Sequence, residues 1–203
     1  MGLYPLPARH GMTVGEIANY LKGEYFPELD LTIIRLKNWQ RSMWFDQTGL
    51  PWVMPSPNMP SLSTAVVYPG MCLLEGTNLS EGRGTTRPFE IFGAPWLDPY
   101  KLKKRLLPYR LTGCLFRPLF FQPTFHKFAG QTCGGLQIHV LDRNKFQPVK
   151  TAIAILLALW DLYPQKIKWR RPPYEDEYKH WPFDILAGNT DLRMNIQQAR
   201  PLN

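Results

Sequence analysis

The sequence predicts an α+β protein in two parts. Over most of the chain, helices and strands are expected in separate runs: helix 98–107, strands 113–121 and 135–142, and helix 149–163. Hydrophobic residues make up 44% of the chain and aromatic residues 13%, which is enough for a packed core. Four prolines in residues 51–60 (PWVMPSPNMP) predict a stiff, extended segment. We therefore place a domain boundary there and divide the chain into residues 1–55 and 56–203.

The first part predicts one helix followed by one strand. Thr13 and Glu16 have the spacing of a capping box, and the apolar residues after them recur on one helical face until Gly23, a natural stop. The apolar run 31–36 (LTIIRL) predicts a strand. One helix and one strand cannot make a core. We therefore interpret this part as the end of a larger α/β domain.

The second part carries clearer signals. Asp98 is placed to cap the helix that follows it. Pro118 interrupts the strand 113–121, which predicts an edge strand or a bulge. The helix 149–163 is apolar on nearly every side and must lie in the core. Two short helices are expected near the end, at 183–187 and 191–198.

The segment 69–96 is the richest in functional groups. Its apolar run 71–74 (MCLL) predicts a strand, and glycine-punctuated polar residues follow it. That polar stretch offers carboxylates, guanidiniums, an amide and threonine hydroxyls. Loops held by a rigid scaffold are common places for binding and catalytic groups. We expect this loop to grip a small polar molecule.

Glu75 is the first candidate in this loop. A partly desolvated carboxylate at the end of a buried element can serve as a general acid or base. The alternative is an ion pair between Glu75 and Arg83 or Arg87 with a purely structural role. Glu81 and Glu90 are weaker candidates, because a lone glutamate near a turn is usually solvated.

Residues 82–86 (GRGTT) resemble an anion-binding nest, in which backbone N–H groups and an arginine converge. They lack the lysine and the glycine spacing of a Walker A loop. The alternative is an ordinary glycine-rich turn.

Metal and cofactor chemistry has no support in the sequence. The histidines form no HExxH pattern, and Cys72, Cys114 and Cys133 have no zinc spacing. His10 lies beside Arg9 in a turn bounded by glycine, and it is the strongest candidate among the histidines for a functional role. We expect no metal and no cofactor.

Aromatic residues offer a further binding surface. The run 125–128 (FHKF) and the tryptophans at 52, 96 and 181 are candidates for a wall on which a sugar stacks. Each of these residues has an equally simple role in the core.

The chain carries a net charge of +8. A basic protein can bind an anionic partner, but a solvated basic face is the simpler explanation. Aromatic residues do not alternate with the lysine and arginine clusters, as a single-strand nucleic-acid platform requires, so we expect no nucleic acid partner. The longest apolar run, 152–160, is about half of what a membrane span needs, and the first residues lack the apolar core of a signal peptide.

Three blocks of sequence resemble a known family. They are residues 4–13 (YPLPARHGMT), 55–60 (PSPNMP) and 68–96, which holds EGTN, GRGT and FGAPW. In this order they are similar to the bacterial exo-β-N-acetylmuramidases of the NamZ type, once a domain of unknown function. The resemblance covers residues 3–190.

The resemblance implies a two-domain enzyme. A Rossmann-like α/β domain would pack on a C-terminal α+β domain with a mixed sheet, and the active site would lie in the cleft between them. Such enzymes release N-acetylmuramic acid from the non-reducing ends of peptidoglycan fragments and are exported, so the implied location is extracellular or periplasmic. The first residues align with the late part of the Rossmann-like domain. We therefore expect a truncated chain whose second catalytic acid lies elsewhere, and whose exposed apolar surface at residues 1–40 lowers its solubility.

The same resemblance suggests roles for individual residues. Glu75 is the expected catalytic carboxylate, and Arg83 the expected partner of the lactyl carboxylate of muramic acid. The remaining predicted ligands would hold hydroxyls or the acetamido group, or face the same cleft from the first domain: Asn78, Thr85, Thr86, His10 and Arg9. The alternative is a module that binds an amino sugar or muropeptide and cleaves nothing.

Overall fold

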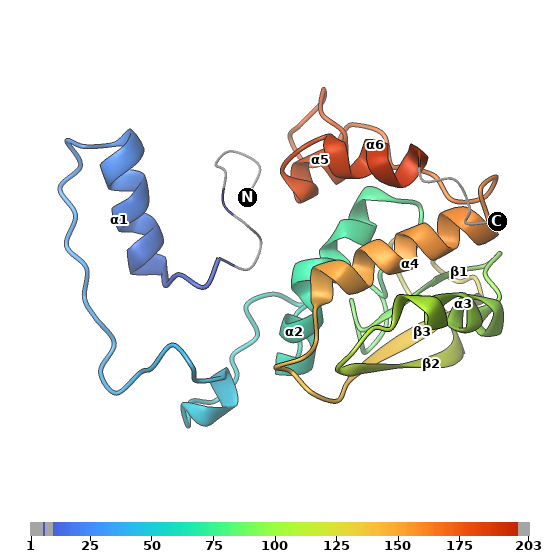
Figure 1. Ribbon diagram of the computed structural model, residues 1–203, viewed down its shortest axis with the longest axis horizontal. Helices are drawn as coiled ribbons and strands as arrows, with labels where there is room; N and C mark the ends of the chain where they lie inside the picture. Colours follow the sequence, from blue (N-terminus) through green and yellow to red (C-terminus); the bar gives the residue numbers. More distant parts are fainter. Residues whose placement is uncertain (1–5, 7–9, 199–203) are drawn as a thin grey trace. The chain divides into compact units, whose positions relative to one another are not determined.

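The computed structural model describes residue 6 and residues 10–198. By its internal contacts the chain separates into two compact units, Leu6–Trp52 and a larger one that holds residues 53–198 (Figure 1). We call them the N-terminal unit and the C-terminal unit. The separation falls inside the proline-rich segment. The interpretation of residues 1–55 as part of a Rossmann-like domain stays a prediction.

The N-terminal unit contains one α-helix, α1 (Val14–Tyr25), and one short 3₁₀ turn, η1 (Phe45–Gln47). The predicted capping box is confirmed: the Thr13 side chain accepts from the N–H of Glu16, and the Glu16 carboxylate accepts from the N–H of Thr13 at 2.7 Å. The helix continues two residues beyond the expected stop at Gly23. None of the residues of α1 is buried.

The strand predicted at residues 31–36 is wrong. These residues are extended but pair with no strand among the described residues. A strand needs a neighbour to receive its backbone hydrogen bonds, and none is supplied here. The side chain of Ile33 packs on Gly15 in α1, whereas Ile34 and Leu36 are strongly exposed.

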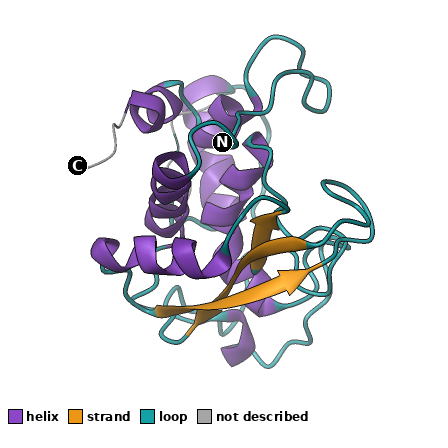
Figure 2. Ribbon diagram, turned by 90° about the vertical axis from the view of Figure 1, so that its right-hand side faces the viewer, coloured by secondary structure: helices purple, strands orange, loops and turns teal. Residues whose placement is uncertain are grey.

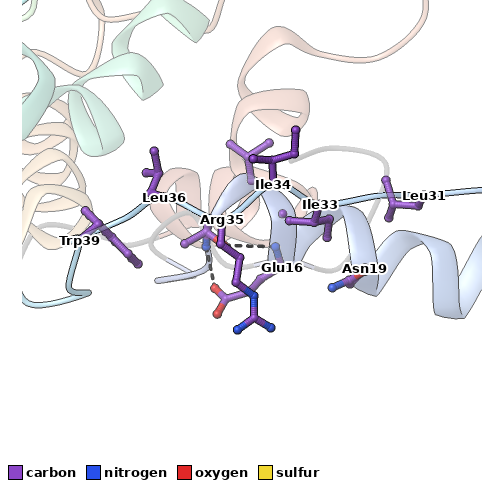
Figure 3. A pocket seen from close by; sticks show the side chains of 11 residues that line it. Glu16, Asn19, Leu31, Ile33, Ile34, Arg35, Leu36 and Trp39 are labelled. Carbon is purple, nitrogen blue, oxygen red and sulfur yellow. Dashed lines mark hydrogen bonds between the residues drawn. The ribbon is translucent and has the colours of Figure 1, made fainter.

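A groove of about 690 Å³ lies between α1 and the extended segment that contains Ile33 and Leu36 (Figure 3). Its carboxylate, Glu16, also pairs with Arg41. The hydrogen bonds from Arg41 and from the N–H of Thr13 lower the pKa of Glu16 to about 2. Glu16 is therefore engaged in capping and pairing within this unit.

The C-terminal unit contains a three-stranded sheet with the order β1-β3-β2; its strands are orange in Figure 2. Its strands are β1 (Ile91–Ala94), β2 (Cys114–Phe121) and β3 (Cys133–Val140). Both strand pairings are antiparallel, so the mixed sheet expected from the resemblance is wrong for the described residues, while the α+β class is confirmed. β2 lies at an edge, which confirms the reading of Pro118, since proline cannot donate to a ladder.

Five α-helices accompany the sheet. They are α2 (Leu62–Met71), α3 (Pro99–Leu106), α4 (Pro148–Leu162), α5 (Pro182–Ala187) and α6 (Asp191–Gln198), and a 3₁₀ turn, η3 (Leu107–Tyr109), follows α3. All but α2 were expected. The side chain of Asp98 accepts from the backbone N–H groups at the start of α3, as predicted. Within the described ranges, no helix has the length and apolar character needed to cross a bilayer.

Helix α4 is the centre of the core. It packs against α2, α3 and α6 (Figure 1), and Ile155, Leu156 and Leu159 are completely buried. Gly70 of α2 lies so close to α4 that a Cβ atom there would be 2.0 Å from the carbonyl oxygen of Pro148. Glycine at this position therefore sets how closely the two helices approach.

The apolar run 71–74 is helical, which corrects the predicted strand. Met71 ends α2, and the 3₁₀ turn η2 (Cys72–Gly76) continues from it. Periodicity does not separate a strand from a buried helix in so short an apolar run. The consequence is that Glu75 lies in a buried helical turn and not at a sheet edge.

Candidate active site

Glu75 lies in η2, and its side chain is 9% exposed. Two donors reach the same oxygen: the Tyr174 hydroxyl donates to Oε2 at 3.1 Å, and Nη2 of Arg83 lies 3.2 Å from Oε2. Among the described residues, both hydrogen-bonding or ion-pair partners of this carboxylate contact Oε2. Oε1 therefore keeps its hydrogen-bonding capacity, and the side chain is 9% exposed.

Tyr174 is protonated where it meets Glu75. Burial and the Glu75 carboxylate raise the pKa of Tyr174 far above its usual value. The phenol is thus a hydrogen-bond donor and cannot serve as an ionised nucleophile near neutral pH. Its ring is covered by Arg170, whose guanidinium carbon lies 5.2 Å from the ring centroid.

Glu81 is the second carboxylate of this cluster, and its side chain is completely buried. Oε1 lies 3.2 Å from Nε of Arg83 and 3.2 Å from Nδ1 of His126, while Oε2 lies 3.0 Å from Nζ of Lys127. Oε1 and Nε of Arg83 are close enough to pair their charges, although their angle makes no hydrogen bond. Arg83 thus bridges Glu75 and Glu81.

Lys127 ties the cluster to the turn that carries Glu75. Besides Glu81, its ammonium donates to the carbonyl oxygens of Leu74 and Glu75, each at 3.3 Å. Both neighbours of Lys127 have positive φ, 69° at His126 and 60° at Phe128. Residues other than glycine rarely adopt that conformation, and when they do they often flank functional sites. These two residues flank Lys127, whose side chain contacts Glu81.

The charges of this cluster set the ionisation of Glu81. Burial raises the pKa of Glu81, but the contact with His126 and the charge of Lys127 outweigh it and bring this pKa to about 2. Burial lowers the pKa of Lys127, while Glu81 opposes that change. Glu81 is therefore an anion that balances buried cations.

Residues 82–86 form a tight turn. Gly82 has a φ of 81°, and a Cβ atom there would lie 2.4 Å from the carbonyl oxygen of Ile91. The N–H of Gly82 donates to Oγ of Ser80, and the hydroxyl of Thr85 donates to the carbonyl of Gly82 at 2.7 Å. The glycine spacing is accounted for by this turn, which presents Arg83 to the two glutamates.

Asn78 joins two distant segments. Its Oδ1 accepts from the N–H of Lys168 at 2.9 Å, and its Nδ2 donates to the carbonyl of Lys166 at 2.9 Å. The N–H of Arg170 donates to the carbonyl of Gly76 at 2.8 Å. Asn78 thereby holds the segment that carries Arg170 and Tyr174 beside the turn that carries Glu75.

This geometry can support acid/base or nucleophilic chemistry at one carboxylate. Glu75 is partly accessible and rigidly held, whereas Glu81 cannot reach a ligand. Glycoside hydrolysis usually needs two carboxyl groups on either side of the scissile bond. Within the described residues, no group of three His, Cys, Asp or Glu side chains is arranged to hold a metal ion.

The comparison with protein families identifies the relatives of this chain. Residues 66–203 match the family described as the C-terminal part of the exo-beta-N-acetylmuramidase NamZ. The chain belongs to the NamZ family. Residues 1–63 match the family's N-terminal part, so the two matches meet close to the proline-rich segment.

Individual NamZ relatives are longer. The chain is 45% identical over 199 residues to the peptidoglycan beta-N-acetylmuramidase NamZ of Bacillus subtilis (strain 168), which covers 98% of this chain and 46% of that protein. Two DUF1343 family proteins of Bacteroides fragilis have similar crystal structures, with TM-scores of 0.84 and 0.60 at 29% and 25% identity. The matches cover 97% and 94% of this chain, but 51% and 48% of those proteins. The chain spans about half the length of these three relatives.

The structure brings together only some of the residues predicted for a NamZ site. Glu75 and Arg83 meet, as the ion-pair alternative predicted, whereas Arg87 pairs with Glu90. The hydroxyl of Thr85 donates a hydrogen bond to the carbonyl of Gly82 in its own turn, and Thr86 is exposed.

Of the two predicted residues in the N-terminal part, His10 alone lies within the described residues. Nδ1 of His10 accepts from the N–H of Met12 at 3.0 Å, within the N-terminal unit. Arg9 lies outside the described residues. The roles predicted for both in binding substrate stay predictions.

Sequence reasoning misjudged two buried glutamates and missed the contacts that two distant residues make with Glu75. Glu81 and Glu90 were expected to be solvated but are buried. Burial is compensated because Glu81 pairs with the cations of Arg83 and Lys127, and because Glu90 accepts from the hydroxyl of Thr64 at 2.8 Å. Tyr174 was not singled out, and Lys127 was considered only within the aromatic run 125–128, because they lie 99 and 52 residues from Glu75 and no local pattern links them to it.

Proposed function

We propose that this chain supplies one wall of an exo-β-N-acetylmuramidase site, which releases N-acetylmuramic acid from the non-reducing ends of peptidoglycan fragments. The observation that carries the proposal is the Glu75 carboxylate, held through Oε2 by Tyr174 and Arg83 with Oε1 available. Membership of the NamZ family and the name of the B. subtilis relative support the chemistry.

Glu75 is the proposed catalytic residue, and Arg83 is proposed to position it. Bidentate binding of a substrate carboxylate needs two parallel N–H groups on one edge of a guanidinium. The edge of Arg83 formed by Nε and Nη2 already pairs with Glu81 and Glu75. We therefore assign Arg83 to fixing the Glu75 side chain, and Asn78 to fixing the loop around it.

The second carboxyl group must come from outside this cluster, because Glu81 is inaccessible. Its distance from Glu75 would decide the stereochemistry: about 5–5.5 Å gives retention and about 6.5–9.5 Å gives inversion. We propose that the substrates are peptidoglycan fragments or muramic-acid saccharides, that the site works outside the cytoplasm in cell-wall recycling, and that catalysis needs no cofactor.

The test uses this chain fused behind the part of the B. subtilis relative that lies outside the 199 aligned residues. The fused protein is assayed with a chromogenic β-N-acetylmuramoside and with the corresponding glucosaminide. We expect cleavage of the muramoside, with a clear preference over the glucosaminide. The chain alone serves as the matched control, because it has the Glu75 wall without its counterpart.

Two other results would change the assignment. A fused protein that binds N-acetylmuramic acid but cleaves neither sugar would favour the amino-sugar-binding module. A fused protein that is folded, as judged by cooperative unfolding, and neither binds nor cleaves would contradict the proposed function.

A further inference from the structure

Arg170 is held beside the catalytic carboxylate by two contacts. Its backbone N–H donates to the carbonyl of Gly76 at 2.8 Å, next to Glu75 in the chain. Its guanidinium carbon lies 5.2 Å from the ring centroid of Tyr174, the ring whose hydroxyl donates to Glu75. Stacking on an aromatic ring orients a guanidinium plane and leaves its N–H edge available.

Arg170 also carries a positive charge that no ion pair within the described residues balances. Among the described residues, Arg83 and Lys127 pair with Glu75 and Glu81, whereas no carboxylate pairs with Arg170. The exposed Glu175 contributes to raising the pKa of Tyr174 but forms no ion pair with Arg170 within the described residues.

The surplus charge is close to the buried cations. Burial lowers the pKa of Lys127, and the charge of Arg170 lowers it further, so the two cations repel each other across the site. Three cations, Arg83, Lys127 and Arg170, thus share two carboxylates. A half-buried guanidinium in this environment favours an anionic ligand.

We propose that Arg170 binds the carboxylate of the ligand and so selects sugars that carry one. The inference rests on the proposed function, under which that carboxylate belongs to the lactyl ether of N-acetylmuramic acid. The lactyl ether is on C3, within one sugar ring of the anomeric carbon, which would face Oε1 of Glu75. The planar fork of arginine matches a carboxylate with two parallel hydrogen bonds.

The experiment measures binding of three sugars to the whole 203-residue chain by isothermal titration calorimetry or NMR titration. The sugars are N-acetylmuramic acid, its methyl ester and N-acetylglucosamine. We expect the free acid to bind about 10-fold or more tightly than the two uncharged sugars, as the loss of a charge-assisted pair predicts. Raised salt should weaken only the binding of the free acid.

The variant Arg170→Met should abolish the preference for the free acid while leaving the affinity for N-acetylglucosamine unchanged. The variant Arg170→Lys, which keeps the positive charge, should retain part of the preference for the free acid. Arg171→Met is the matched control, because it removes the same charge from the next, exposed residue. We expect it to keep the preference. Thermal unfolding of each variant checks that the fold is intact.

The results separate the two proposals. A parent chain that binds all three sugars equally would overturn the role of Arg170 and leave the amino-sugar site standing. An Arg170→Met chain that keeps the preference, or that loses all three sugars equally, would also overturn it. The comparison of the acid with its ester needs no substitution, so a variant that fails to fold does not remove the test. A folded parent chain that binds none of the sugars would overturn the role of Arg170, whereas the proposed function is decided by the fused protein.

Discussion

The two units of this chain differ most in what they bury. All the buried residues of the described part lie in the C-terminal unit, which closes a core around α4 and encloses charged groups as well. The described part of the N-terminal unit has a well-capped helix but no buried residue. The difference teaches that local signals suffice to specify a helix, whereas burying Glu81 among cations requires a core assembled from distant segments.

Breaking the buried charge cluster should have the largest effect on stability. Lys127→Met leaves the inaccessible Glu81 carboxylate with less compensation, and removing one partner of a buried pair costs about 3–5 kcal/mol. Chemical denaturation should report this loss in the unfolding of the C-terminal unit. Lys145→Met is the control, since its pair with Asp142 is solvent-exposed, and we expect a change within about 0.5 kcal/mol. Equal effects of the two variants would contradict the account.

A matched pair of apolar truncations compares the units directly. Leu156→Ala opens a cavity beside α4 and should cost about 2–5 kcal/mol. Ile34→Ala removes the same kind of side chain from the N-terminal unit, where Ile34 is 92% exposed, and should change the free energy of unfolding by less than about 0.5 kcal/mol. A large loss at Ile34 would show that another surface covers it in solution.

Acid should act on the C-terminal unit through Glu81. Because the pKa of Glu81 in the folded chain, about 2, lies below its ordinary value of 4.5, its contribution is complete above pH 4.5 and is lost as the pH falls toward 2. The shift corresponds to about 3 kcal/mol. Glu16 has a similarly lowered pKa in the N-terminal unit. Denaturation at each pH should show the same acid loss in a Glu16→Gln chain; disappearance of that loss would contradict the assignment to Glu81.

The parts of the fold that the sequence predicts are those with local signals. The cap at Asp98, the edge position of Pro118 and the apolar helix α4 are all confirmed, because each depends on a few neighbouring residues. Helix α2 was missed because Pro69 and Gly70 lie inside it. The extended segment that contains Ile33 was misassigned because hydrophobicity alone does not supply a partner strand.

The residues of the candidate site also divide into those that local sequence predicts and those that it does not. Glu75 and Arg83 lie in one loop, so their pairing was among the predicted alternatives. Tyr174 and Lys127 reach Glu75 from distant segments that are folded into place by Asn78 and by the left-handed residues around Lys127. Sequence spacing carries no information on such contacts.

The most direct test of the account is the Glu75→Gln substitution in the fused protein described above. Glutamine keeps the shape and the hydrogen-bonding oxygen but removes the acid/base and nucleophilic capacity. We expect hydrolysis of the chromogenic β-N-acetylmuramoside to fall by about 100-fold or more, while N-acetylmuramic acid still binds. The matched control, Glu175→Gln, changes an exposed carboxylate beside Tyr174 and should keep full turnover. Full turnover by the Glu75→Gln protein would contradict the central claim.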